Sequence, residues 1–98
     1  MKSKEAKLQS MCVTWFRYWY PKLTPVLVAI PNGGSRNIIE AANLKKQGII
    51  AGVADLILFV PNKDFHGLCI EMKYEKGKQS EHQKQWQEAI EKQGYKYI

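Results

Sequence analysis

The chain has little of what marks a secreted, membrane-spanning or zinc-binding protein. Its two cysteines, Cys12 and Cys69, lie among apolar neighbours, which favours reduced thiols in a cytoplasmic setting. The two histidines and two cysteines are too scattered for a zinc-binding spacing. No apolar run approaches the ~20 residues that span a bilayer, and no apolar segment follows the charged N-terminus as in an export signal. We therefore expect a cytoplasmic protein with no membrane contact.

Acidic residues are also scarce: nine Asp and Glu side chains stand against fifteen Lys and Arg side chains, which leaves a net charge of +6. A basic balance of this kind favours a polyanionic partner, nucleic acid before a membrane surface. The 98 residues, 45% of them apolar, suffice for one domain with a modest core. Neither an internal repeat nor a linker divides the chain, so we expect a single domain over residues 1–98.

Apolar spacing and chain-breaking residues predict three helices and four strands. Pro21 ends the first helix, while Gly48 and Gly94 are suited to end the other two. The predicted fold class is α/β, with a small mixed β-sheet flanked by helices in the order αβαββαβ. The predicted helices cover residues 3–19, 37–47 and 80–93, and the predicted strands cover residues 26–30, 54–60, 68–74 and 95–98.

Three charged residues, Asp55, Glu71 and Lys73, lie within two neighbouring strands that are otherwise apolar. Burying an ionised group costs several kcal/mol unless the group is paired or binds a metal. The loop between the strands is centred near residues 63 and 64, so an antiparallel hairpin places Asp55 opposite Glu71 or Met72. Side chains alternate along a strand, so Glu71 and Lys73 share a face. The three side chains should therefore meet.

Two interpretations of this cluster remain open. Two neighbouring carboxylates repel each other unless a cation lies between them, and hard oxygen ligands suit Mg²⁺ or Mn²⁺. The alternative is a cross-strand salt bridge from Lys73 to Asp55 or Glu71 on a half-wet sheet face. Both strands are apolar on both faces, which predicts central strands covered on each side and favours the metal site.

The Asp55 and Glu71-x-Lys73 pattern is similar to the core of the PD-(D/E)xK nuclease superfamily, and the whole chain resembles a small VRR-NUC (virus-type replication-repair nuclease) domain. One departure is Ala54, where the superfamily pattern has a proline. Family domains usually continue past the last strand, so the end at Ile98 points to a shortened chain or a strand completed by a partner. The matching segments are Glu5 with Gln9, then residues 30–36 (IPNGGSR), 44–48 (LKKQG), 52–56 (GVADL), 70–73 (IEMK) and 80–83 (SEHQ) with Trp86.

This resemblance implies a restriction-endonuclease-like core that hydrolyses DNA phosphodiester bonds with Mg²⁺ or Mn²⁺. Asp55 and Glu71 would bind the metal together with the backbone carbonyl of Met72. Lys73 would be the catalytic lysine, because an ammonium group can stabilise the attacking hydroxide or the charge on the phosphate. The implied setting is DNA replication, repair or recombination in a bacterial or phage-infected cell.

Glu5 and Gln83 each have a structural and a functional interpretation. Glu5 suits the first turn of a helix electrostatically, but it begins the apolar stripe and should point inward. The resemblance makes it a third acid of the site, bound to the metal through water, with Gln9 one turn later to hold it. Ser80 and Gln83 form a capping-box pattern. The resemblance directs Gln83 toward the metal-bound water or the phosphate, which we expect to require a side chain turned away from the cap.

Contacts to DNA are predicted from a glycine turn and from lysines. The turn is either a simple chain reversal or a backbone surface open to a phosphate, with an arginine adding positive potential. The lysines either line a DNA groove or are simply solvated. The candidate substrate-binding residues are Asn32, Gly33, Gly34, Arg36, Lys76 and Lys78.

The favoured function is a Mg²⁺-dependent endonuclease for four-way junctions or other branched DNA. Cutting both strands symmetrically calls for two active sites, so we expect a homodimer. The alternatives are a non-catalytic DNA-binding module and a subunit of a larger nuclease assembly. The joint presence of Asp55, Glu71 and Lys73 favours the enzyme. One further stripe is interpreted either as core or as a dimer surface, and consists of Met11, Trp15, Phe16 and Trp19.

Overall fold

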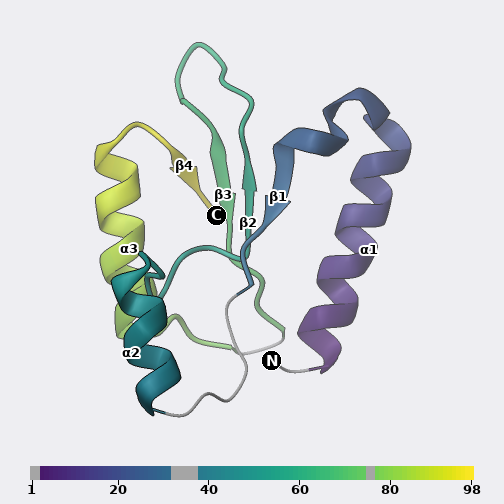
Figure 1. Ribbon diagram of the computed structural model, residues 1–98. Helices are drawn as coiled ribbons and strands as arrows, with labels where there is room; N and C mark the ends of the chain where they lie inside the picture. Colours follow the sequence, from purple (N-terminus) through teal and green to yellow (C-terminus); the bar gives the residue numbers. More distant parts are fainter. Residues whose placement is uncertain (1–2, 32–37, 75–76) are drawn as a thin grey trace.

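The computed structural model describes residues 3–31, 38–74 and 77–98, which form a four-stranded mixed sheet with helices (Figure 1). This confirms the predicted α/β class. A short 3-10 helix, η1, follows the first helix and was not predicted from the sequence. The elements are α1 (Ser3–Trp19), η1 (Pro21–Val26), β1 (Leu27–Ala29), α2 (Ile38–Lys46), β2 (Leu56–Leu58), β3 (Leu68–Ile70), α3 (Glu81–Lys92) and β4 (Lys96–Tyr97).

The sheet has the strand order β1-β2-β3-β4. The β1–β2 and β2–β3 pairs are antiparallel, whereas β4 runs parallel to β3. Figure 1 shows α2 and α3 on one side of the sheet and α1 on the other. Among the described residues, no helix is both long and apolar enough to cross a bilayer.

The core lies between the sheet and α3. Ala54, Ile57 and Cys69 are buried there, and Trp86 and Ile90 of α3 pack against them. Burial raises the pKa of the Cys69 thiol, which suits an inert packing residue. This side of the sheet is covered, as its apolar sequence predicts.

The opposite side of the sheet is covered only in part, since Leu56 is buried and Leu58, Leu68 and Ile70 are half-buried. Helix α1 stands across an apolar groove of about 620 Å³ from the side chains of Leu56, Leu58 and Ile70. The expectation of two covered faces is therefore met at Leu56 and only in part along the rest of this face, because periodicity shows which side chains are apolar and not what packs on them. Cys12 is exposed on α1, where it lines this groove among apolar residues, as expected.

The helices have nearly the predicted bounds, whereas the strands are shorter. Gly48 and Gly94 have φ angles of 102° and 90°, the left-handed conformation that ends a helix. Strand β2 begins at Leu56 and not at residue 54, because the Asp55 side chain, and not a ladder carbonyl, accepts the Met72 N–H.

Gly52 is required where the chain before β2 crosses the start of α3. Its φ is +88°, and a Cβ there would overlap the backbone carbonyl group of His82 and lie 2.8 Å from the Gln83 nitrogen. We expect Gly52→Ala to lower the melting temperature by more than the roughly 4–8 °C that corresponds to about 1 kcal/mol in a domain of this size. Differential scanning calorimetry would measure the change.

Gly48→Ala is the matched control for that substitution. Gly48 also has a positive φ, but its Cβ would meet nothing within 4 Å. The difference between the two variants therefore isolates the steric overlap from the backbone strain. Equal losses of stability would show that the close approach of Gly52 to α3 is unimportant.

Candidate active site

Asp55 and Glu71 lie at the same end of the β2–β3 hairpin. The last paired residues of the ladder are Leu56 and Ile70, and the two acids come one position beyond that pair. Asp55 is buried, and its Oδ2 accepts a hydrogen bond from the Met72 N–H at 2.8 Å. The hairpin itself thus holds the Asp55 carboxylate in place.

Glu71 is held from several sides. Its backbone N–H donates to the Ile98 carbonyl at 2.9 Å, which continues the pairing of β3 with the last residues of the chain. Its side chain is 8% exposed, and Oε2 accepts a hydrogen bond from Gln83 Nε2 at 3.0 Å. Its other oxygen, Oε1, is buried and accepts no hydrogen bond from an N–H donor among the described residues, so a contact with the Asp55 carboxyl group requires a shared proton. A buried carboxylate oxygen without a donor requires a proton or a cation.

Asp55 influences the protonation of Glu71. Burial, followed by a hydrogen bond to Asp55 and the negative charge of Asp55, raises the pKa of Glu71 from 4.5 to about 7, while Lys73 acts in the opposite direction. The charge of Glu5 also raises this pKa. Both other carboxylates therefore oppose ionisation of Glu71, and a bound cation would offset this repulsion.

The raised pKa predicts a pH dependence of stability. The folded state holds the Glu71 proton more tightly than the unfolded state, so this contribution is fully present below pH 4.5 and is lost as the pH rises through about 7. In EDTA, we expect Glu71→Gln to flatten this decline and to raise the melting temperature at pH 8. Thermal unfolding between pH 4 and pH 8 would measure it.

Glu88→Gln is the control, because Glu88 is an exposed acid of α3 whose partner is the exposed Lys92. It should leave the wild-type pH profile unchanged. A parallel decline in wild type and Glu71→Gln would show that Glu71 does not carry the pH effect.

Gln83 joins the start of α3 to the acids and to Lys73. Its side-chain Oε1 accepts from the Ser80 backbone N–H at 2.7 Å, and the backbone N–H of Gln83 donates to Ser80 Oγ, so the capping box is formed. The same Oε1 accepts from Lys73 Nζ at 3.0 Å, while Nε2 donates to Glu71. The expectation that the side chain must leave the cap to reach the site is wrong. Oε1 of the amide accepts from both the cap and Lys73, while Nε2 donates to Glu71.

Lys73 lies at the edge of this cluster. Its side chain is 30% exposed, and its Nζ is 3.8 Å from Glu71 Oε2. The ammonium group is therefore oriented by Gln83 and Glu71 and remains reachable from solvent. A positive group of this kind can meet an anion that approaches the carboxylates.

The other predicted site residues lie as follows. Glu5 is half-buried in the first turn of α1, and Gln9 has a buried Oε1 with no partner among the described residues. Within the described ranges, no group of three or more His, Cys, Asp or Glu side chains is close enough to hold a metal ion, so Glu5 does not complete a compact ligand set. Lys78 is exposed before α3. Outside the described residues lie Asn32, Gly33, Gly34, Arg36 and Lys76.

A small pocket of about 350 Å³ beside Glu71 and Lys73 was missed from the sequence. Gln79, Gln87 and Tyr97 line it, and Gln79 Nε2 donates to Gln87 Oε1 at 2.7 Å and to the Tyr97 hydroxyl at 3.3 Å. The spacing of Gln83 and Gln87, one helical turn apart, is a signal that could have indicated a shared face. Tyr97 gives no comparable signal.

The comparisons with known proteins identify the family and the fold. The family described as VRR-NUC domain matches residues 2–98. The chain belongs to the VRR-NUC family. A solved structure titled "VRR_NUC domain protein" superposes with a TM-score of 0.83 at 27% identity, and the match covers 100% of this chain and 77% of that one. No curated protein matches the sequence. The VRR-NUC domain is a nuclease-type domain of the PD-(D/E)xK superfamily, as the resemblance predicted.

The residues of this VRR-NUC domain fit a divalent cation. Asp55 and Glu71 supply neighbouring carboxylates, and Glu71 Oε1 is a buried oxygen without a donor among the described residues. Hard oxygen atoms of this type are the ligands that Mg²⁺ and Mn²⁺ prefer. With two protein carboxylates, the remaining positions would be filled by water and by oxygens of the substrate, the usual arrangement for Mg²⁺.

Proposed function

We propose that this VRR-NUC domain is a Mg²⁺- or Mn²⁺-dependent DNA endonuclease that hydrolyses phosphodiester bonds. The observation that carries the proposal is the buried Glu71 Oε1, which has no donor among the described residues and neighbours the Asp55 carboxylate. Buried polar atoms normally have a hydrogen-bond partner, whereas this oxygen receives no N–H or O–H donor from the described residues and lies beside a second carboxylate. An acid pair with a free oxygen beside an accessible lysine supports a hydrolytic site.

Each side chain of the cluster has a role in this reaction. Asp55 and Glu71, with the backbone carbonyl of Met72, would hold the cation, which supplies a Lewis acid and lowers the pKa of bound water. Lys73 would face the phosphate and stabilise the negative charge that develops on it. Gln83 would hold Lys73 and Glu71 in register, and Glu5 would orient water from the side of α1.

Branched DNA, in particular a four-way junction, is the proposed substrate, and a homodimer is the proposed form of the enzyme. The net charge of +6 supports a polyanionic substrate. A domain of this size covers little DNA, so two symmetric cuts need two copies related by a two-fold axis. Lys78 is exposed, and its sequence neighbours Gly77 and Gln79 line the small pocket beside Glu71 and Lys73. Its position supports contact with the DNA backbone next to that pocket.

The direct test is cleavage of labelled junction, flap, single-stranded and duplex DNA by the purified domain, in Mg²⁺, in Mn²⁺ and in EDTA. We expect cleavage that requires the metal and is fastest on the branched substrates. Cleavage that persists in EDTA would contradict the metal dependence. Equal rates on all four DNAs would contradict the preference for branches.

DNA binding should weaken steeply with salt. Each phosphate neutralised by a lysine or arginine contributes roughly −0.9 to the slope of log affinity against log salt. We expect a slope that corresponds to several phosphates. Fluorescence anisotropy in Ca²⁺ would measure it as the salt concentration is raised about fourfold, from roughly 50 to 200 mM. A flat response would remove nucleic acid as the partner.

A further inference from the structure

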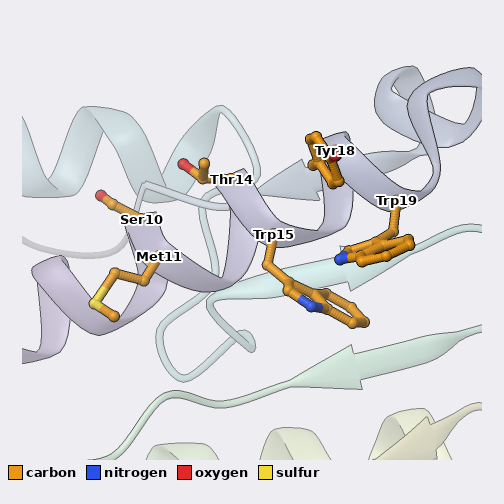
Figure 2. A pocket seen from close by; sticks show the side chains of 6 residues that line it. All are labelled: Ser10, Met11, Thr14, Trp15, Tyr18 and Trp19. Carbon is orange, nitrogen blue, oxygen red and sulfur yellow. The ribbon is translucent and has the colours of Figure 1, made fainter.

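Two hollows of the surface differ in their chemistry. Figure 2 shows the hollow on α1, whose lining side chains are uncharged and include Met11, Trp15 and Trp19. These three side chains are exposed, so the interpretation of their stripe as core is wrong for them. The small pocket beside the acids is lined instead by Glu71, Lys73 and several hydrogen-bonding side chains. The second hollow therefore offers donors to an anion that approaches the acid pair.

The last strand places Tyr97 in this pocket. Tyr97 pairs with Cys69 in the parallel β3–β4 ladder, and the Glu71 N–H continues the ladder by donating to the Ile98 carbonyl. Cys69 and Glu71 are two residues apart, so their side chains lie on the same face of the sheet. The Tyr97 ring packs against Trp86 of α3 on this face, with ring centroids 6.3 Å apart. The core thus fixes the ring of a tyrosine that lines the pocket together with Glu71.

A chain of hydrogen bonds orients the Tyr97 hydroxyl group. Glu91 Oε2 accepts from Gln87 Nε2 at 3.2 Å, and the other end of that amide, Gln87 Oε1, accepts from Gln79 Nε2. Gln79 Nε2 also donates to the Tyr97 oxygen. A tyrosine hydroxyl can both accept and donate, and among the described residues the Tyr97 proton has no acceptor. The hydroxyl group is therefore an oriented donor that is available to a ligand.

The hydroxyl group keeps its proton at neutral pH. Burial raises the pKa of Tyr97 above the ordinary value of 10, the hydrogen bond from Gln79 lowers it in part, and the negative charges of Glu71 and Asp55 raise it. The hydroxyl is thus within electrostatic reach of both acids. Tyr97 can donate to a ligand of the acid pair as a neutral group.

The available donors of the pocket suit a phosphate group better than a base. The Lys73 ammonium group borders the same pocket, so an oxyanion there would meet a positive charge and a hydroxyl donor together. Bidentate reading of a base edge requires a side-chain amide that offers both of its ends. The amides of Gln79 and Gln87 are hydrogen-bonded to each other, so neither has both ends available.

We propose that this pocket is a subsite for the DNA phosphate next to the scissile one, and that the Tyr97 hydroxyl donates a hydrogen bond to that phosphate. The inference rests on the proposed function, because the acid pair defines where the scissile phosphate lies. Successive phosphates of one strand are about 3.4 Å apart along the helix axis. A strand that meets the acids therefore carries its next phosphate to the groups beside them. Such a contact positions the strand and reads no base sequence.

The first test is Tyr97→Phe, which keeps the ring against Trp86 and removes the hydroxyl group alone. We expect this variant to bind the labelled four-way junction in Ca²⁺ about 10-fold more weakly than the wild type, near the lower end of the range for a hydrogen bond to a charged group. In the cleavage assay KM should rise with kcat nearly unchanged, because the contact is made equally in the ground state and the transition state. Binding as tight as that of the wild type would overturn the proposal.

The second test locates the phosphate. The phosphates on either side of the scissile one are replaced, one at a time, by a neutral methylphosphonate. At one of the two positions the replacement should weaken binding by the wild type about 10-fold and binding by Tyr97→Phe no further. Losses that multiply at both positions would overturn the proposal. A loss in Tyr97→Phe that depends on the bases flanking the cut would overturn it in favour of base recognition.

Tyr95→Phe is the matched control. It removes the same atom from a tyrosine that contacts His66 of the hairpin loop and does not line the pocket. This variant should bind and cleave as the wild type does. Equal losses in Tyr95→Phe and Tyr97→Phe would overturn the proposal in favour of a general effect on β4.

Binding in Ca²⁺ and cleavage in Mg²⁺ separate the subsite from the proposed function. A domain that cleaves DNA in an Asp55-dependent manner, and in which Tyr97→Phe equals the wild type, would overturn the subsite and leave the nuclease. A domain that cleaves no DNA would overturn the proposed function. In that domain, a single methylphosphonate that weakens binding by the wild type and not by Tyr97→Phe would still support the phosphate subsite.

Discussion

Replacing Asp55 with Asn is expected to lower the rate of DNA cleavage by at least about 10³-fold. The amide oxygen of Asn can still accept the Met72 N–H, so the hairpin should keep its geometry. The negative charge that attracts a cation is lost, however, and with it the several kcal/mol of charge stabilisation that a bound metal provides. Each 1.36 kcal/mol corresponds to a tenfold change in rate, so a loss of about 4 kcal/mol gives this factor.

Metal binding by the same variant can be measured without any substrate. Mg²⁺ or Mn²⁺ at about 100 times its dissociation constant stabilises a protein by about 2.7 kcal/mol, which raises the melting temperature of a domain of this size by roughly 10–20 °C. We expect this rise in the wild type and its loss in Asp55→Asn. Asp64→Asn is the control, because Asp64 is exposed in the loop between β2 and β3. Wild-type cleavage by Asp55→Asn would eliminate the acid pair as the active site.

Replacing Lys73 with Ala is expected to lower the cleavage rate by about 10²–10³-fold, the usual effect of removing one group that stabilises transition-state charge. DNA affinity in Ca²⁺ should fall by no more than about fivefold, because one exposed ion pair contributes about 1 kcal/mol or less. The separation of rate from affinity follows from the position of Lys73, whose Nζ is tied to Gln83 and Glu71 at the acids.

Lys92→Ala provides the comparison for Lys73→Ala. Lys92 lies in the last turn of α3 and pairs with Glu88 at the surface, so its removal takes away one positive charge far along the helix from Gln83. Rate and affinity of this variant should stay close to those of the wild type. If Lys73→Ala reduced DNA binding as much as cleavage, the role of Lys73 would be to maintain the structure or to bind DNA, and not to stabilise charge in the hydrolysis.

The helices could be predicted from the sequence because their ends are marked locally. Pro21 follows α1, and Ser80 with Gln83 begins α3 as a capping box. The position of the loop left two registers for the hairpin, with Asp55 opposite Glu71 or Met72, and the observed pairing of Leu56 with Ile70 corresponds to the first. Helix η1 was missed because Pro21 and Pro25 are compatible with turns, extended chain and 3-10 structure alike.

The site could be predicted in part. The charges of Asp55, Glu71 and Lys73 in apolar strands indicated where the acids lie, because buried charge is costly and therefore rarely accidental. The orphan oxygen of Glu71 and the shared amide of Gln83 depend on rotamers and on the distance between α3 and the hairpin, which no local pattern encodes. For the same reason the groove between α1 and the sheet was not predicted. The sequence pattern of an apolar face is the same whether or not another part of the chain covers that face.

The double hydrogen bonding of Gln83 restricts what can replace it. A capping box accepts Glu as readily as Gln at its third helical position. A carboxylate at 83 would keep the start of α3, yet it would remove the donor to Glu71 Oε2 and set one more negative group against an acid whose pKa is already raised. A substitution that helix propensity treats as conservative would therefore be disruptive here, because two unrelated demands, one from the helix terminus and one from the carboxylates, converge on a single neutral amide.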